Sequence, residues 1–161
     1  MAKVFLICGK ICSGKTRYAR MLAAREGAVI LSCDELDEAI FHHALGEAHD
    51  RVMADVHRYL HRKAIEIARA GASVVLDWGF WRAQERERVS AMYREAGVPF
   101  EWHAVRVSDA DWARNIAERN ARVKAGECGD YFVDDGLLEK LLRLFEEPKD
   151  EEMDVIVDNR R

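Results

Sequence analysis

The sequence lacks a long hydrophobic run, and this absence excludes several classes of protein. Its longest apolar stretches span about six residues, far below the roughly 20 that a membrane-spanning helix needs. The first residues, Met1 to Lys3, lead straight into a short strand-like run, which is not the pattern of a secretory signal. We therefore expect a protein of the cytoplasm that does not associate with a membrane.

An excess of positive charge and a set of paired cysteines are missing too. The 25 basic residues against 29 acidic ones give a net charge of -4, so the whole molecule has no electrostatic reason to bind nucleic acid or an anionic membrane. The four cysteines include no CxxC pair and do not follow a secreted disulfide framework. Repeats and linkers are also absent, and a chain of 161 residues therefore predicts one domain that spans residues 1–161.

Short apolar runs alternate with helical patterns along the chain. The runs typical of buried strands are Lys3 to Cys8, Gly27 to Ser32, Ser73 to Asp77, Phe100 to Val107 and Met153 to Val157. Helical spacing or a helical start lies between them, at Gly14 to Arg25, from Asp34, at Arg51 to Ala70, Trp81 to Ala96, Asp109 to Lys124 and Leu138 to Phe145. This alternation predicts an α/β fold with a parallel sheet, right-handed crossovers and helices on both faces.

A glycine-rich loop lies between the first predicted strand and the first predicted helix. It fits the pattern G-x-x-x-x-G-K-[ST] completely, and its residues are Gly9, Lys10, Ile11, Cys12, Ser13, Gly14, Lys15 and Thr16. The glycines allow the backbone to approach phosphates closely, and amide groups of the loop and the helix N-terminus attract them. We expect Lys15 to reach the β- and γ-phosphates of ATP and Thr16 to place its hydroxyl on Mg²⁺.

Two aspartates follow predicted strands, and the carboxyl ends of parallel strands are where chemistry gathers in such sheets. Asp34 is the candidate carboxylate that orients an acceptor hydroxyl and takes its proton. Its alternative role is that of a helix N-cap. Asp77 ends the third strand and can hold Mg²⁺ directly or through water, or it can serve as a turn residue.

Aromatic and histidine side chains near these aspartates admit two interpretations each. Trp78, Phe80 and Trp81 can stack on the ring of an acceptor or pack against the following helix. His57 and His61 are four residues apart on a predicted helix, a spacing that can bind zinc. Because the run between them lacks the glutamate of H-E-x-x-H, we favour a polar helix face for this pair.

A basic cluster precedes the glycine-containing loop that begins near residue 126. Its members are Arg114, Arg119, Arg122 and Lys124. Transfer of a phosphoryl group needs cationic donors from a mobile element that also excludes water. We therefore expect a helical lid over about residues 109–135, in which Arg119 and Arg122 act on ATP. The alternative is a solvated helix face whose basic residues pair with Asp111 and Glu118.

The order of these parts resembles that of one group of small P-loop kinases. The resemblance covers nearly the whole chain and rests on GKICSGKT, on Asp34, on LDWGFWRAQERERV and on ERNARVKAGECGDYFVDDGLLEKLLRLFEEP. The group contains the 5′-kinase domain of phage polynucleotide kinase, zeta toxins and chloramphenicol phosphotransferase, with an AAA-type ATP-binding domain. It implies a P-loop NTPase three-layer sandwich with a five-stranded parallel sheet in the order 2-3-1-4-5, Lys15 and the lid arginines on the phosphates, and Asp34 as general base.

One residue departs from this pattern. The polynucleotide kinases of the group carry an arginine three residues after the base, and this chain has Asp37 there. With Glu35 and Glu38 beside it, we expect an acidic acceptor mouth that repels a polyanion. The favoured function is therefore an ATP- and Mg²⁺-dependent phosphotransferase that acts on a hydroxyl group of a small neutral or cationic molecule. The alternatives are a polynucleotide 5′-hydroxyl kinase and an ATP-binding regulatory or NTPase module.

Overall fold

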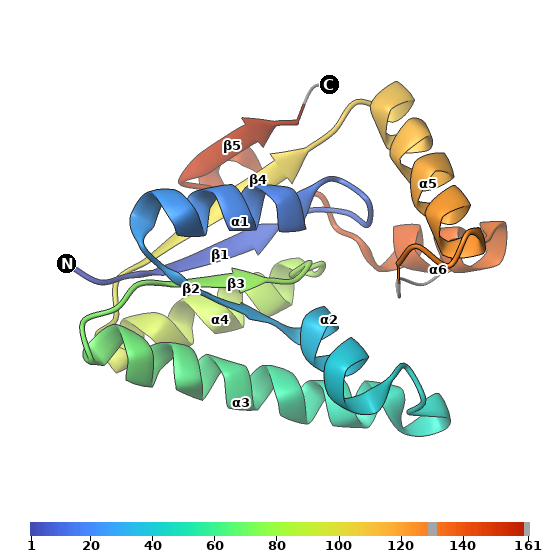
Figure 1. Ribbon diagram of the computed structural model, residues 1–161. Helices are drawn as coiled ribbons and strands as arrows, with labels where there is room; N and C mark the ends of the chain where they lie inside the picture. Colours follow the sequence, from blue (N-terminus) through green and yellow to red (C-terminus); the bar gives the residue numbers. More distant parts are fainter. Residues whose placement is uncertain (129–131, 160–161) are drawn as a thin grey trace.

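The fold is built on one sheet of five parallel strands (Figure 1). The computed structural model describes residues 1–128 and 132–159. The strands are β1 (Val4–Cys8), β2 (Val29–Ser32), β3 (Val74–Asp77), β4 (Phe100–Arg106) and β5 (Val155–Asp158), and their order in the sheet is β2-β3-β1-β4-β5. Every pairing is parallel. The strand order that the resemblance implied is thus confirmed.

Helices cover both faces of the sheet and give the molecule three layers (Figure 1). The longer helices are α1 (Lys15–Glu26), α3 (His49–Arg69), α4 (Ala83–Ala96), α5 (Asp109–Lys124) and α6 (Asp135–Leu144). Shorter turns are α2 (Cys33–Leu36), the π-helical η1 (Asp37–Phe41), and the 3₁₀ turns η2 (Gly46–Ala48) and η3 (Asp150–Glu152). α1 packs on one face, and α3 and α4 pack on the other.

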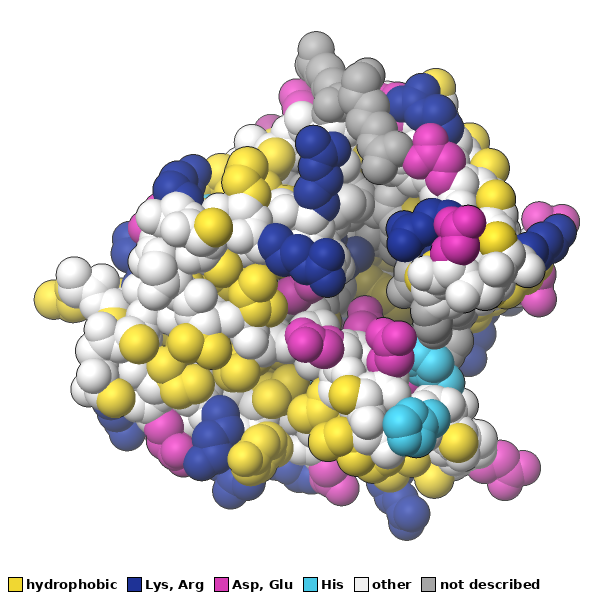
Figure 2. Space-filling model, in the orientation of Figure 1, with side chains coloured by type: hydrophobic (Ala, Val, Ile, Leu, Met, Phe, Trp, Pro, Cys, Tyr) yellow, Lys and Arg dark blue, Asp and Glu magenta, His cyan; other side chains and the backbone are white. Residues whose placement is uncertain are grey.

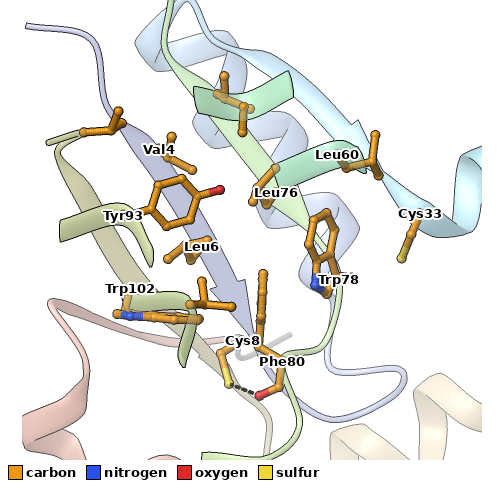
Figure 3. Packing of buried hydrophobic residues seen from close by; sticks show 14 of the residues in the cluster. Val4, Leu6, Cys8, Cys33, Leu60, Leu76, Trp78, Phe80, Tyr93 and Trp102 are labelled. Atoms are coloured by element: carbon orange, nitrogen blue, oxygen red, sulfur yellow. Dashed lines mark hydrogen bonds between the residues drawn. The ribbon is translucent and has the colours of Figure 1, made fainter. Parts of the chain in front are cut away.

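Alternation along β1 divides the core into two clusters. Phe5 and Ile7 point toward α1, whereas Val4, Leu6 and Cys8 point toward α3 and α4 (Figure 3). All five residues of β1 are at most 2% exposed. Side chains of a strand point alternately to its two faces, so a central strand covered on both faces must be apolar throughout, as the sequence predicted.

The strand register brings the ends of three strands to one edge of the sheet. Asp77, the last residue of β3, pairs with Ile7 of β1 and with Ser32 of β2. The loops that follow these strands therefore begin side by side. At the same end of the molecule, α5 and α6 stand away from the sheet at the right of Figure 1, and neither helix contains a buried residue.

Two further structural features complete the comparison with the sequence. None of the four cysteines forms a disulfide, and all four lie in the part of the chain that the structure describes. Among the described helices, none combines the length and apolar character required to cross a membrane. The lid predicted over about residues 109–135 includes residues 129–131, which lie outside the described residues.

Candidate active site

The predicted phosphate loop, residues 9–16, joins β1 to α1. Gly14 adopts φ 92° and Cys12 adopts φ 56°, both in the left-handed region that favours glycine. A Cβ atom on Gly9 would lie 2.7 Å from the carbonyl oxygen of Val105 and 2.8 Å from Ser13 Oγ, which leaves no room for a side chain. The conformation of the loop therefore depends on the glycines that define the motif.

The loop also contains polar groups suited to an anion. Ser13 is fully buried, and its Oγ atom has no hydrogen-bond partner among the described residues. Lys15 is the first residue of α1, and its Nζ atom donates to the carbonyl oxygen of Lys10 at 2.8 Å. A buried hydroxyl, an ammonium group and a helix N-terminus in one loop fit the phosphate groups of a nucleotide.

Lys15 lies in the electric field of two carboxylates. Burial lowers the pKa of Lys15, while the nearby charges of Asp77 and Asp34 raise it. Both predicted carboxylates thus act on the same ammonium group, although they follow different strands. This convergence is the central electrostatic feature of the site.

Thr16 and Asp77 lie together at the start of α1 and the end of β3. A hydrogen bond joins their side chains, and Asp77 is only 4% exposed. Burial raises the pKa of Asp77, and the hydrogen bond from Thr16 and the charge of Lys15 oppose this rise. A hydroxyl and a carboxylate are oxygen ligands suited to Mg²⁺, which commonly takes only one or two protein ligands beside the phosphates.

Asp34 occupies the first turn of α2 and is exposed. Ser32 caps this helix, because its side chain accepts a hydrogen bond from the Glu35 amide at 3.3 Å. The alternative role of Asp34 as the N-cap is therefore wrong. Burial lowers the pKa of His57 and the charge of Asp34 opposes this fall, so the Asp34 carboxylate lies near α3 as well as near Lys15.

Asp37 is turned into the protein. It is 1% exposed, and its Oδ2 atom lies 2.8 Å from Nδ1 of His43. The expectation that Asp37 lines an acidic mouth is therefore wrong, because its carboxylate holds the end of the π-turn η1. The acidic residues that are exposed here are Asp34, Glu35 and Glu38. Figure 2 shows acidic side chains below a hollow that has basic side chains on both sides.

The aromatic residues after β3 have separate roles. Trp78 lies parallel to the ring of His57, with centroids 5.0 Å apart, and its Nε1 atom is buried with no hydrogen-bond partner among the described residues. Phe80 is a core residue, since it is 1% exposed and packs edge-on against Trp102 (Figure 3). Trp81 lies against Gly79, where a Cβ atom would meet its indole nitrogen at 1.8 Å.

The histidines of α3 do not form a metal site. Across residues 1–128 and 132–159, no group of three or more His, Cys, Asp or Glu side chains could hold a metal ion. His61 is 8% exposed, and its Nδ1 atom lies 2.8 Å from the hydroxyl of Tyr93. The expectation of a polar helix face is also wrong for His61, because its buried ring packs against the aromatic rings of Trp78, Phe80 and Tyr93.

The predicted lid residues differ in what they contact. Nη1 of Arg119 lies 3.8 Å from Sγ of Cys12 in the phosphate loop. Arg122 is exposed, three residues further along α5. Arg114 pairs with Asp111, three residues earlier, which is a contact of the kind expected from the alternative of a solvated helix face. Arg119 therefore contacts the phosphate loop, whereas Arg114 pairs within α5.

Several residues at the site escaped the sequence interpretation. Trp112, Asn115 and Asn159 donate hydrogen bonds to carbonyl oxygens of the phosphate loop. Asn159 directly follows β5, so the rule that polar residues gather after parallel strands also identifies it. Arg86, which is 3% exposed, donates to the carbonyl oxygen of Phe80 at 3.1 Å and so holds the turn after β3.

The comparison with known families agrees with this geometry. A profile of the AAA domain family matches residues 4–148. The chain belongs to the AAA domain family. No curated protein matches the sequence of this AAA domain.

Solved structures share the fold over the whole chain. A sugar kinase from a Janibacter species has a TM-score of 0.70 and 18% identity, with 100% of this chain and 87% of that chain covered. APS kinase from Mycobacterium tuberculosis, in complex with AMPPNP and APS, has a TM-score of 0.69 and 22% identity, with coverages of 99% and 90%. A putative kinase from Chloroflexus aurantiacus has a TM-score of 0.73 and 23% identity, with coverages of 98% and 88%.

These likenesses establish the fold of P-loop kinases for this AAA domain. They do not distinguish the narrower group of polynucleotide kinase, zeta toxins and chloramphenicol phosphotransferase, so that resemblance stays a prediction. The roles assigned to the individual site residues also stay predictions at this point.

Proposed function

We propose that this AAA domain is a kinase that uses ATP and Mg²⁺ to phosphorylate a hydroxyl group of a small molecule. The observation that carries the proposal is that Asp77 and Asp34 both act on the ammonium group of Lys15. A module that only binds or hydrolyses nucleotide needs the phosphate loop, but it needs no second carboxylate from the helix α2 that follows β2. The similar structures are those of a sugar kinase, an APS kinase and a putative kinase, and they support the same class of reaction.

The donor half of the reaction falls to the phosphate loop. Bound ATP and Mg²⁺ supply a phosphoryl group that is activated for transfer. The loop amides and Lys15 would hold the phosphates, and Thr16 and Asp77 would hold the metal. Arg119, which reaches the loop at Cys12, is placed to neutralise negative charge. We assign Arg122 to the same task in a closed lid.

The acceptor half depends on Asp34. Its exposed carboxylate can accept a proton from a hydroxyl group while that group attacks, which is the role of a general base. Trp78 lies near Asp34, because His57 contacts both. The His57 ring stacks on that of Trp78, and the charge of Asp34 acts on the pKa of His57. The indole nitrogen of Trp78 can donate a hydrogen bond to a polar atom of the acceptor.

The acceptor that fits this surface carries no cluster of negative charges. Asp34, Glu35 and Glu38 are all exposed on the segment that follows β2. Their charges would repel a nucleic-acid backbone, even though Asp37 is not among them. We therefore favour a small neutral or cationic acceptor over an oligonucleotide. A location in the cytoplasm remains a prediction of the sequence.

The direct test is transfer of a labelled γ-phosphate to a panel of acceptors. Nucleosides, sugars, aminoglycosides and 5′-hydroxyl oligonucleotides would be offered in turn. Labelling of a small hydroxyl compound supports the proposal, whereas labelling of the oligonucleotide alone supports a polynucleotide 5′-hydroxyl kinase. Release of inorganic phosphate that no acceptor changes would instead support an NTPase module.

The role of Asp34 is tested by the variant Asp34→Asn, with Glu35→Gln as the matched control. We expect Asp34→Asn to retain ATP binding and to lower transfer by about 10²- to 10⁴-fold, the range of a general base. Glu35 is an exposed neighbour on the same short helix, so its variant should transfer phosphate like the wild type. Unchanged transfer by Asp34→Asn would remove Asp34 from the mechanism.

A further inference from the structure

The phosphate loop is held from outside by side chains of α5. Nε1 of Trp112 donates to the carbonyl oxygen of Ile11 at 2.7 Å, and Nδ2 of Asn115 donates to the carbonyl oxygen of Cys12 at 3.0 Å. The two donors are three residues apart and so lie on the same face of the helix. The ring of Trp112 is in turn fixed by the ammonium group of Lys10, which lies 4.0 Å from the ring centroid.

A third side chain reaches the next carbonyl group from the other end of the sequence. Nδ2 of Asn159 donates to the carbonyl oxygen of Ser13 at 2.8 Å. The backbone amide of Asn159 donates to the carbonyl oxygen of Arg106 at 2.8 Å, which fixes the residue at the end of β5. A Cβ atom on Gly14 would lie 2.1 Å from Nδ2 of Asn159, so the contact is close-packed against the loop.

These three bonds determine where the amide groups of the loop point. In a trans peptide the C=O and the following N–H point in opposite directions. Holding the carbonyl groups of Ile11, Cys12 and Ser13 outward therefore turns the N–H groups of the next three residues inward. The amide of Ser13 points across the loop, where it donates to the carbonyl oxygen of Lys10 at 3.3 Å, and this bond must be exchanged for one to a phosphate when nucleotide binds.

We propose that Trp112, Asn115 and Asn159 are positioning residues that orient the loop amides toward the phosphates before nucleotide binds. Successive inward N–H groups form an anion-binding concavity whose worth depends on their alignment. The first half of α5 is then part of the nucleotide site, and only its later turns, with Arg122, belong to a lid. The proposal rests on nucleotide binding by the proposed kinase and not on its acceptor.

The test compares Asn115→Leu with Ala117→Leu by calorimetric titration of ADP, inorganic tripolyphosphate and adenosine. Leucine keeps the approximate size of asparagine but cannot donate, and Ala117 is an exposed residue of the same helix. We expect Asn115→Leu to bind ADP and tripolyphosphate about two- to tenfold more weakly, the effect of one lost hydrogen bond. Adenosine affinity should not change, because adenosine carries no phosphate. Ala117→Leu should match the wild type with every ligand.

A second variant distinguishes weaker phosphate binding from a general loss of folding. Trp112→Phe keeps an aromatic ring over Lys10 and removes only the N–H donor, so it should weaken the two phosphate ligands by a similar factor. A variant that melts at a lower temperature but binds ADP and tripolyphosphate like the wild type would overturn the proposal.

Failure of the proposed function is distinguishable. Wild type that binds ADP but phosphorylates no acceptor removes the kinase assignment and leaves the positioning role standing. Wild type that binds neither ADP nor tripolyphosphate removes both.

Discussion

The donor and acceptor sides of the site are built in contrasting ways. On the donor side, glycines fit without spare room and side chains from α5 and β5 hold the phosphate loop. On the acceptor side, a short α-helix passes into a π-turn that ends with His42 and His43 at positive φ, and the indole nitrogen of Trp78 has no partner among the described residues.

This contrast follows from what each side has to recognise. A phosphate group presents the same oxygens whatever molecule carries it. A phosphate loop whose conformation is held by neighbouring side chains can therefore bind the phosphates of any nucleotide. An acceptor differs from enzyme to enzyme, and strained backbone or unused polar groups gather where a particular ligand binds. The donor half therefore carries the general chemistry, and the acceptor half carries the specificity.

On the donor side, the largest effect is expected from the loss of Lys15. Lys15→Met removes the ammonium group that donates to the loop and lies near Asp77 and Asp34. We expect phosphoryl transfer to fall about 10²- to 10³-fold, the loss typical of one oriented donor. Single-turnover transfer of labelled phosphate measures it, with Lys63→Met as the control on the exposed face of α3. A loss of similar size in the control would point to a general effect of charge.

On the acceptor side, His61, which packs against Trp78, should make the free energy of unfolding depend on pH. Burial, together with the smaller effect of the neighbouring charges of His57 and Arg88, lowers the pKa of His61 to about 4, from an ordinary value of 6.5. Between about pH 6.5 and pH 4, His61 is protonated in the unfolded chain but not in the folded chain. The stability is therefore complete above about pH 6.5 and falls by roughly 3 kcal/mol as the pH drops toward 4.

Urea unfolding at several pH values measures this slope. The double variant His61→Phe with Tyr93→Phe removes both members of the buried pair, so no hydroxyl is left without a partner. We expect the double variant to flatten the slope between about pH 4 and 6.5. His49→Gln, on a half-exposed residue of α3, should leave the slope unchanged. A double variant that keeps the full slope would show that His61 does not cause it.

A smaller effect is expected from Asp37, which separates structural from ligand-facing carboxylates on the acceptor side. Asp37→Ala removes the partner of His43 at a buried position and should lower the free energy of unfolding by about 1–3 kcal/mol. Glu38→Ala, at the exposed next residue, should change it by less than about 0.5 kcal/mol. Equal values for the two variants, again from urea unfolding, would contradict the buried role of Asp37.

The sequence predicted the donor side far better than the acceptor side, and the reason is the range of the interactions. Strand periodicity and the loop motif are local patterns, and they place Thr16 beside Asp77 once the strands are parallel. Trp112 and Asn115 bind loop residues that lie 101 and 103 positions away, which no local pattern predicts.

The errors on the acceptor side have a related origin. The sequence placed Asp37 at the acceptor mouth by its position three residues after Asp34 and by its acidic neighbours, but the positive φ of His43 brings an imidazole to it and allows the carboxylate to be buried. Ser32, two residues before the predicted helical start at Asp34, takes the cap that Asp34 seemed suited to fill. Charge and propensity do not determine which way these side chains point, because tertiary contacts decide it.

The smallest effect we predict compares two of the four tryptophans, which differ in whether the indole nitrogen has a hydrogen-bond partner. Trp78 and Trp102 are each 4% exposed. Nε1 of Trp102 donates to Oγ of Ser90 at 2.8 Å, whereas Nε1 of Trp78 has no partner among the described residues. Replacement of either by phenylalanine keeps an aromatic ring and removes the N–H donor.

Trp78→Phe should raise the KM for the acceptor about two- to tenfold, the worth of one hydrogen bond, and leave the KM for ATP unchanged. Trp102→Phe should instead lower the free energy of unfolding, because it leaves the Ser90 hydroxyl buried without its donor, and should change neither KM. Steady-state kinetics with the acceptor found in the labelling screen, together with urea unfolding, separates the two outcomes. If Trp78→Phe loses only stability, as Trp102→Phe does, then its indole nitrogen does not face the acceptor and the acceptor-binding surface must be sought nearer to Asp34.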